Sequence, residues 1–353
     1  MRGIYLSFRF MVACSIMSLL FSCEHRRLED PINTHYVRVY LDEQIKNVTC
    51  GFYNDTLEKP EYERPAALRA ILANPETGEI VSERILHNHG DDGRGHYIDG
   101  HIAAPAGVYD FMAYEIGSTI TNIRNENNMH SMLAYTNKID GRLLQYLPSV
   151  STAIDNDRIV STPEHMSHVA KKDIRIYSLT HIDTLRDSNG DYFTASSLVL
   201  SYFIQVKVKG IKWVKAAATL MGGMAGSAYM RDKGELNVTD PVYVFFGLNN
   251  PNGNSGKRTQ NDADEAYLYA TFNTFGKIPD IPTLYTLNFE FTKSDNSTQV
   301  ETIDITEMFD TPLVKNNQWI LLDKIIEITP PTGSGGMKPG VEGWKDIEAD
   351  IIM

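Results

Sequence analysis

Cysteine is scarce in this chain, with only 3 among 353 residues. A fold stapled by several disulfides is therefore excluded, because such folds need a dense set of cysteines. Positive charge is also in deficit: 33 Lys and Arg stand against 45 Asp and Glu, which gives a formal net charge of −12. This balance argues against a nucleic-acid partner, since affinity for phosphates is built from Lys and Arg.

Long apolar runs and common catalytic motifs are missing as well. Beyond the N-terminus no uncharged apolar stretch approaches the length of about 18 residues that would suggest a membrane-spanning helix. The chain has no G-x-S-x-G, H-E-x-x-H, P-loop or C-x-x-C pattern. The glycine-rich stretch 222–226 lacks a following Lys-Ser/Thr and predicts a bend in a strand rather than a phosphate-binding loop. We expect no catalytic residue and no cofactor.

The first residues have the pattern of a targeting segment. Arg2 and Arg9 are the only charged residues before Glu24, and the uncharged run 10–21 is too short to span a bilayer. The run ends in Leu19-Leu20-Phe21-Ser22-Cys23, which resembles a bacterial lipobox. We therefore expect a signal peptide over 1–22, lipidation at Cys23 and a short lipidated tether over 23–34. Two or more acyl chains would give a stable membrane anchor.

Cys50 is then the one free thiol of the processed chain, since Cys14 leaves with the signal peptide. It lies in the strand-like run Val48-Thr49-Cys50-Gly51-Phe52. A lone cysteine in such a run is typical of a small buried apolar residue, so we interpret it as structural and unreactive.

Most of the remaining sequence follows the two-residue period of strands. One clear run alternates at Tyr285, Leu287, Phe289 and Phe291, with Thr286, Asn288, Glu290 and Thr292 on the opposite, solvated face. Similar runs begin at Val37 and Leu198, and turn-forming clusters separate them. We predict an all-β fold of antiparallel sheets, with one or two helical turns at 140–146 and 304–309.

The length suggests about two domains at roughly 150 residues each. A polar stretch and Pro163 interrupt the strand pattern between Pro148 and Lys172. We therefore predict an N-terminal β-sandwich over 35–165 and a C-terminal one over 166–353.

Four of the ten histidines cluster around the turn Asp91-Asp92-Gly93. They are His87, His89, His96 and His101. A hairpin could bring two or three of these imidazoles within reach of Zn²⁺, but the sequence offers no evident closing ligand. We interpret them as polar residues of a solvated hairpin and predict no metal site.

Several motifs, taken in order, resemble a known family. After Cys23 come His35-Tyr36-Val37-Arg38-Val39-Tyr40, then Arg94-Gly95-His96-Tyr97 and Ala104-Pro105-Ala106-Gly107-Val108-Tyr109-Asp110-Phe111. The second half has 217–230, with its glycine cluster, and the tail has Gly335-Gly336-Met337-Lys338-Pro339-Gly340. Together they resemble the fimbrial-subunit and fimbrial-anchor lipoproteins of Bacteroidales, which build type V pili.

The resemblance implies two tandem β-sandwiches of transthyretin-like topology, a place on the cell surface and no catalysis. It also implies partners: other fimbrial subunits joined by donated strands, and the outer membrane through the lipid on Cys23. Polymerising members carry a propeptide between the lipid and the first strand, whereas here only about a dozen residues, 23–34, intervene. This departure favours an anchor or accessory subunit.

Two other functions stay open at this stage. One is a surface glycan-binding lipoprotein of a carbohydrate-uptake system, which predicts aromatic side chains aligned on an exposed face. Trp213, Trp319 and Trp344 are far apart in the sequence and are better explained by core packing. The other is a hydrolase, for which no segment argues.

The C-terminal residues 346–353 alternate apolar and acidic side chains behind a glycine-rich stretch. They predict a last strand that either completes its own sheet or is donated to a neighbouring subunit.

Overall fold

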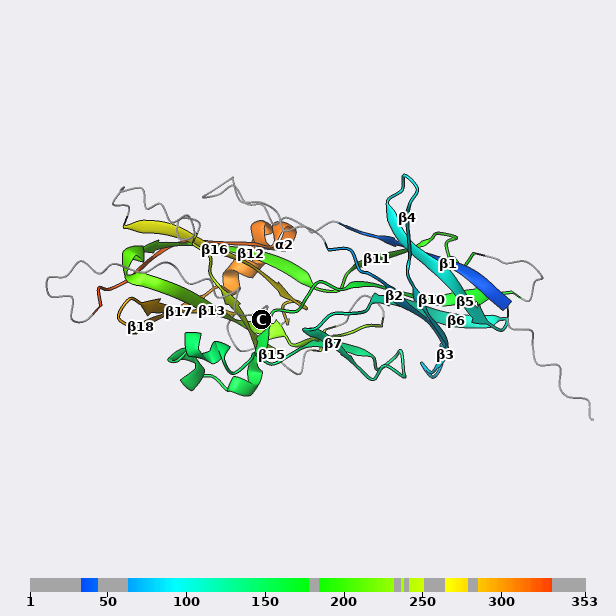
Figure 1. Cartoon of the computed structure of the whole chain (residues 1–353), viewed down its shortest axis with the longest axis horizontal. Helices are drawn as coiled ribbons and strands as arrows, with labels where there is room; N and C mark the ends of the chain where they lie inside the picture. The colour runs from blue at the N-terminus through cyan, green and yellow to red at the C-terminus, as the bar shows by residue number, and fades with distance from the viewer. Residues whose placement is uncertain are drawn as a thin grey trace, which may run out of the picture.

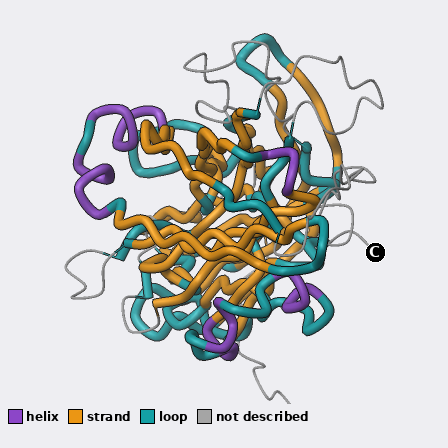
Figure 2. The backbone as a smooth tube through the Cα atoms, turned by 90° about the vertical axis from the view of Figure 1, so that its left-hand side faces the viewer, coloured by secondary structure: helices purple, strands orange, loops and turns teal. Residues whose placement is uncertain are grey.

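The computed structural model describes residues 33–43, 63–177, 184–231, 236–237, 241–250, 264–278 and 285–331. Strands dominate these residues, and the one α-helix among them, α2 (Pro312–Asn317), is six residues long. Figure 1 shows an elongated molecule with two strand-rich halves, and Figure 2 shows the helical turns at its periphery. The predicted all-β fold is confirmed. Across the described ranges, no helix is long and apolar enough to cross a membrane.

The first sandwich contains eight strands in the order β3-β2-β6-β10-β11-β1-β5-β4. Their bounds are β1 (Asn33–Leu41), β2 (Leu68–Ala73), β3 (Ile80–Leu86), β4 (Asn88–Asp91), β5 (His96–Ala104), β6 (Gly107–Glu115), β10 (Ser167–Ile176) and β11 (Phe193–Ser197). The sheet passes from one layer of the sandwich to the other at β11. The first residues of β11 pair with β1, and its last residues pair with β10. The two layers enclose a core in which the rings of Phe111 and Phe193 stack at 4.0 Å.

The second sandwich packs the three-stranded sheet β16-β12-β19 against the five-stranded sheet β18-β17-β13-β15-β9. Their bounds are β9 (Ile159–Ser161), β12 (Leu200–Lys209), β13 (Val214–Ala225), β15 (Pro241–Gly247), β16 (Glu265–Thr274), β17 (Thr286–Lys293), β18 (Thr298–Asp304) and β19 (Trp319–Glu327). The alternating face of β17, Tyr285 to Phe291, enters this core as the sequence predicted. Short 3-10 turns flank the strands: η4 (Ile211–Trp213), and η5 (Thr306–Asp310) near the helical turn predicted at 304–309.

A small third sheet lies at the junction of the two sandwiches. It contains β7 (Thr121–Arg124), β8 (Leu133–Thr136) and β14 (Ser227–Tyr229), in the order β14-β8-β7. Its residues share one apolar cluster with the outer faces of β2 and β6 and with Ala225 and Phe275 of the second sandwich. The cluster is rich in methionine, with Met112, Met129, Met132, Met166 and Met230. The sandwiches therefore meet through a continuous apolar contact.

Residues 139–159, which we call the strap, cover the outer face of the five-stranded sheet. The strap contains the 3-10 turns η1 (Leu143–Tyr146), η2 (Val150–Thr152) and η3 (Asn156–Arg158). Its Leu143, Tyr146 and Leu147 pack in one cluster with Ala218 and Phe245 of the sheet. The helical turn predicted at 140–146 is thus present as η1.

The strand pairing differs from the expected division at residues 165 and 166. β9 precedes that point but pairs with β15 of the second sandwich, whereas β10 and β11 follow it and pair with β6 and β1. Among the described residues, the last crossing from the first sandwich to the second falls between Ser197 and Leu200. The polar stretch that suggested a boundary belongs to the strap, which packs on the second sandwich. After the strap the chain returns to the first sandwich as β10 and β11.

The sheets are also mixed rather than wholly antiparallel. In the part of the chain that the structure describes, three strand pairs are parallel: β1 with β11, β12 with β19, and β15 with β9. A parallel pair needs a long crossover connection, and each of these pairs joins strands that are far apart in the chain. Period-2 alternation does not distinguish the two directions, so the sequence could not show this.

The glycine cluster at 222–226 lies at the end of β13, with Gly222 and Gly223 inside the strand and Gly226 just beyond it. The register shifts between Gly222 and Met224, and Gly223 has φ +85°. A Cβ on Gly223 would lie 2.4 Å from Cδ1 of Tyr285, so this position needs glycine for both conformation and space. The prediction of a glycine bend in a strand is confirmed.

Candidate functional site

Several residues singled out in the sequence lie outside the described residues. They are the lipidation residue Cys23, the thiol of Cys50, Trp344 and the terminal stretch 346–353. Trp213 packs at the edge of the second core, and Trp319 packs beside Phe203 and Leu321. Both described tryptophans therefore serve packing, as expected.

The histidine hairpin is formed by β4 and β5. Its register places His96 opposite Asp91, while His89 lies opposite Ile98. The imidazoles make separate contacts: His89 Nε2 lies 3.0 Å from the carbonyl oxygen of Ala66, and the His101 ring packs edge-on against Tyr36. Among the described residues, no group of three or more His, Cys, Asp or Glu is arranged to hold a metal ion.

β1 occupies a central place in its sheet. Its residues pair with β5 on one side over Asn33 to Tyr40 and with β11 on the other side over Val39 to Leu41. Val37 and Val39 are fully buried in the first core. The sheet position next to β5 is thus filled by the chain's own first strand.

The outer face of β1 and β5 carries a cluster of tyrosine, arginine and aspartate side chains, which we call the Tyr–Arg face. Arg38 Nη1 donates to Asp92 Oδ2 at 2.7 Å, and its guanidinium carbon lies 3.7 Å from the ring centre of Tyr97. The hydroxyl of Tyr40 also donates to Asp92, at 2.7 Å. This hydrogen bond lowers the pKa of Asp92, so the carboxylate stays charged beside Arg38.

Guanidinium groups also cover the neighbouring rings of the Tyr–Arg face. Arg186 lies 4.0 Å from the ring centre of Tyr192, and Tyr192 meets Tyr40 edge-on at 5.6 Å. A sugar ring stacks on an open aromatic face, and here one face of Tyr97 and one of Tyr192 are already occupied. This surface is therefore a weak platform for the glycan-binding alternative.

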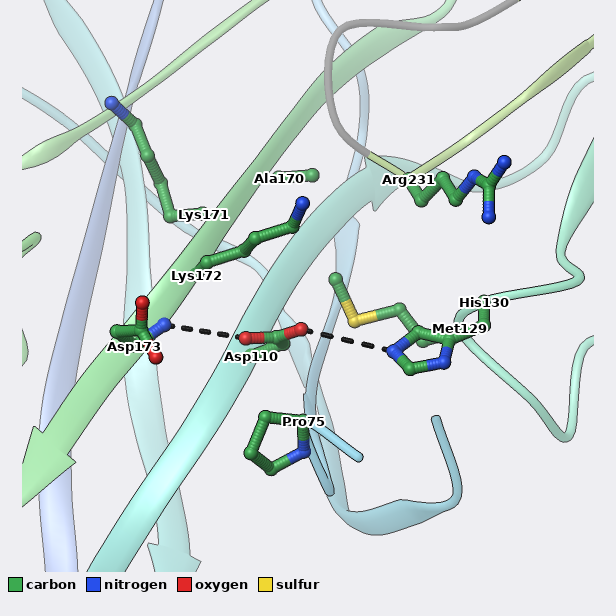
Figure 3. A pocket seen from close by; sticks show the side chains of 9 residues that line it. All are labelled: Pro75, Asp110, Met129, His130, Ala170, Lys171, Lys172, Asp173 and Arg231. Atoms are coloured by element: carbon green, nitrogen blue, oxygen red, sulfur yellow. Dashed lines mark hydrogen bonds and ion pairs between the residues drawn. The ribbon is translucent and has the colours of Figure 1, made fainter. Parts of the chain in front are cut away.

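A pocket of about 360 Å³ opens at the junction of the sandwiches (Figure 3). Its floor is the carboxylate of Asp110 in β6, a residue only 4% exposed. Oδ1 of Asp110 accepts the backbone N–H of Asp173 at 3.2 Å, and His130 Nε2 lies 3.9 Å from Oδ2. Lys171, Lys172, Asp173 and Arg231 add to the polar lining, while Pro75, Met129 and Ala170 add apolar contacts.

The backbone around this pocket is held in an unusual shape. β10 has a bulge between Lys171 and Ile174, and Asp173 within it takes a left-handed conformation with φ 58°. This conformation is uncommon for a residue other than glycine, although aspartate tolerates it better than most. The bulge aims the N–H of Asp173 at Asp110.

The second lining loop is fixed by the β2–β3 turn. Met129 N donates to the carbonyl oxygen of Gly78 at 2.8 Å, and Asn128 Nδ2 donates to that of Thr77 at 2.8 Å. A Cβ on Gly78 would lie 2.7 Å from Cγ of His130, so the two loops are in close contact. The pocket is therefore preformed rather than dependent on loop closure.

Asp110 was not predicted as a site residue. It lies in the motif 104–111, where its neighbours Tyr109 and Phe111 follow the pattern of an ordinary strand. The signal available was a charged residue on a strand whose other outward residues, Met112 and Tyr114, are apolar. That pattern indicates a covered face with one polar opening.

Comparison with known proteins gives one family match and several relatives. Residues 88–246 match a family described as a domain of unknown function, DUF5119. A curated protein of Bacteroides ovatus, named as a candidate fimbrium anchoring subunit, Fim4B, is 23% identical over 280 residues, or 69% of this chain and 74% of that protein.

A solved structure shows the same fold. The crystal structure of a candidate adhesin from Bacteroides ovatus superimposes with a TM-score of 0.55 and 19% identity, covering 88% of this chain and 98% of that one. The fimbrial anchor protein Mfa2 of Porphyromonas gingivalis has a TM-score of 0.45 and 12% identity, over 81% of this chain and 88% of that one. The resemblance to fimbrial anchor-like proteins of Bacteroidales, drawn from the sequence motifs, is confirmed.

Proposed function

We propose that this chain is a non-catalytic subunit of a surface fimbrium, held in the outer membrane by a lipid on Cys23, that acts as an anchor or accessory subunit. The observation that carries the proposal is the similarity to the candidate fimbrium anchoring subunit, which covers 69% of this chain and 74% of that protein. The fold shared with the candidate adhesin is consistent with a role on the cell surface.

The position of β1 supports an anchor or accessory subunit over a stalk subunit. A subunit that accepts a donated strand has to offer an open sheet position for it. Here β1 already fills the place between β5 and β11, with Val37 and Val39 fully buried. A neighbouring subunit would then contact another edge, which suits a subunit at the base of a fimbrium.

The proposal is tested in the producing bacterium with Cys23→Ser and, as the matched control, Cys50→Ser. Wild type and Cys50→Ser should both keep the protein in the outer-membrane fraction and keep fimbriae on the cells in electron micrographs. Cys23→Ser should release the protein into soluble fractions, and fimbriae should be shed into the medium.

Two results would overturn the proposal separately. Membrane retention of Cys23→Ser equal to wild type would reject the lipid anchor. Unchanged fimbriae in a strain that lacks the chain altogether, together with no fimbrial protein recovered with the tagged wild type, would reject membership of a fimbrium.

A further inference from the structure

The end of the first sandwich at which β1 begins carries exposed apolar side chains. Between Asp99 and Asp110 the sequence has no Asp, Glu, Lys or Arg, and this run contains the connection from β5 to β6. Val108 of β6 is 43% exposed, and Tyr177, directly after β10, is 61% exposed. Ala106 of the connection is exposed as well. Apolar side chains that gather at a surface mark an interaction site, whereas scattered ones do not.

These side chains share one face of the sheet with an arginine. Val108 pairs with Arg175 across β6 and β10, so the two side chains point to the same side. Arg175 and Tyr177 are exposed, while Ile174 and Ile176 of the same run are buried in the core. No described residue forms a hydrogen bond or an ion pair with the Arg175 side chain. We call Val108, Arg175 and Tyr177 the end patch.

The chain beside the end patch is held in place. The hydroxyl of Tyr109 donates to the carbonyl oxygen of Pro105 at 3.0 Å, and Tyr109 itself is buried. A Cβ on Gly107 would lie 3.0 Å from the same hydroxyl, so the backbone passes closely over the Tyr109 ring. A surface that is already ordered loses little conformational entropy when it meets a partner.

The end patch lies at the end of the molecule from which the tether starts. Asn33, the first residue of β1, pairs with Ala104, the last residue of β5, and Figure 1 shows β5 and β6 at the end away from the second sandwich. The tether from Cys23 to Asn33 spans at most about 36 Å when fully extended. A lipid on Cys23 would therefore keep this end of the first sandwich near the bilayer.

We propose that the end patch rests on the lipid surface, with Val108 and the Tyr177 ring among the headgroups and Arg175 against lipid phosphates. An aromatic ring with a polar tip favours the bilayer interface, and a guanidinium pairs well with phosphate. A chain with a net charge of −12 is repelled by an anionic surface, so an end with a long charge-free run and a free arginine is suited to approach it. This inference rests on the membrane anchoring proposed above.

The test uses the full processed chain on vesicles of phosphatidylcholine and phosphatidylglycerol. A histidine tag ahead of a Cys23→Ser chain holds it on nickel-chelating lipid, so the result does not depend on lipidation. In a Cys50→Ser background, a fluorophore is attached at Ala106→Cys beside the end patch or, as the reference, at Asp295→Cys in the exposed turn between β17 and β18. Lipids with a nitroxide in the headgroup region should quench the first label several-fold more strongly than the second.

Variants of the exposed side chains locate the contact. Val108→Ser with Tyr177→Ser should reduce quenching of the Ala106→Cys label to the level of the reference label. Arg175→Gln should reduce it on vesicles with phosphatidylglycerol and leave it unchanged on phosphatidylcholine alone, since the charge is then without an anionic partner. The matched control is Val300→Ser with Ile325→Ser, which changes two exposed apolar residues of the second sandwich and should leave the quenching as in the parent chain.

Each result supports or overturns the proposal. Equal quenching of the two labels overturns it, as does quenching that survives in the Val108→Ser, Tyr177→Ser chain or is lost equally in the control. Shielding of the Ala106→Cys label that requires added fimbrial protein would assign the end patch to a subunit contact and overturn it too. If the double variant does not fold, Arg175→Gln and the two labels on the parent chain still decide. Failure of the lipid anchor is seen separately, as membrane retention of untagged Cys23→Ser in the bacterium.

Discussion

The two sandwiches treat their outer sheet faces in opposite ways. The five-stranded sheet of the second sandwich is covered by the strap, and its outward residues Ala216, Ala218 and Leu220 are buried. The face of β1 and β5 in the first sandwich has no such cover among the described residues and carries the Tyr–Arg face instead. One face is thus stabilised by apolar burial and the other by polar contacts at the surface.

The sequences of the strands account for this difference. β13 reads Val-Lys-Ala-Ala-Ala-Thr-Leu-Met, an almost continuous apolar run, and both of its faces are buried. β1 alternates strictly, with Val37, Val39 and Leu41 turned inward and Tyr36 and Arg38 outward. A continuous run therefore indicates a strand covered on both sides, whereas alternation indicates one covered side.

The largest effect is expected where the strap is attached. Glu290 of β17 is fully buried, and its carboxylate accepts the backbone N–H groups of Ser149 and Val150, each at 2.9 Å. Glu290→Ala would leave the N–H of the buried Val150 and that of the more exposed Ser149 without this partner. The change should lower the free energy of unfolding by about 3 kcal/mol, as measured by urea denaturation.

The matched control is Glu307→Ala, an exposed acid of η5, which should change stability by less than about 0.5 kcal/mol. Glu290→Gln keeps one acceptor oxygen and should fall between the two. An equal, small effect of all three changes would mean that the strap does not depend on Glu290.

Glu290 also shows how far sequence reasoning reaches. The alternation of β17 correctly placed Leu287, Phe289 and Phe291 in the core, but it assigned Glu290 to a solvated face. The two-residue alternation along a strand shows which side chains share a face. It cannot show that a segment about 140 positions away in the chain will cover that face. The strap's own sequence, polar at 151–158, gave the impression of a linker for the same reason.

The candidate pocket was beyond sequence reasoning on similar grounds. Its residues come from five separate segments, and the bulge that aims the N–H of Asp173 at Asp110 depends on sheet register. The existence of the strands, their core faces and a glycine bend at 222–226 follow from local chemistry and were predicted. Parallel pairing and the return of β10 to the first sandwich are long-range outcomes and were not.

A second, smaller effect should appear at the junction, where the first sandwich has a covered face of its own. His168 of β10 is 7% exposed beside Met166, and burial lowers its pKa to about 4 from the ordinary 6.5. Because the folded-state pKa lies below the unfolded one, the protein has this stability in full above pH 6.5 and loses it as the pH falls toward 4.

Between pH 7 and pH 5 the loss attributable to His168 should be about 2 kcal/mol. The check compares wild type with His168→Gln, which cannot gain a charge, by denaturation at several pH values. The variant should lose less stability on acidification, and the gap between the two should narrow as the pH falls. Parallel pH profiles would show that His168 is not the group responsible.

The smallest effect is expected on the open Tyr–Arg face. Arg38 is 19% exposed, lies 3.7 Å from the Tyr97 ring centre and pairs with Asp92 at 2.7 Å. Such contacts at a solvated surface are each worth a fraction of a kcal/mol to about 1 kcal/mol, because water competes for the same groups. Arg38→Ala should therefore lower the free energy of unfolding by about 1 kcal/mol. Arg38→Lys should recover less than half of this loss, since an ammonium lacks the planar fork that meets Tyr36 and Asp92 together.

Arg84→Ala, on the exposed side of β3, serves as the control and should be nearly neutral. A cost for Arg38→Ala as large as that for Glu290→Ala would mean that the Tyr–Arg face is itself covered in the folded chain, and the contrast between the two outer faces would fail.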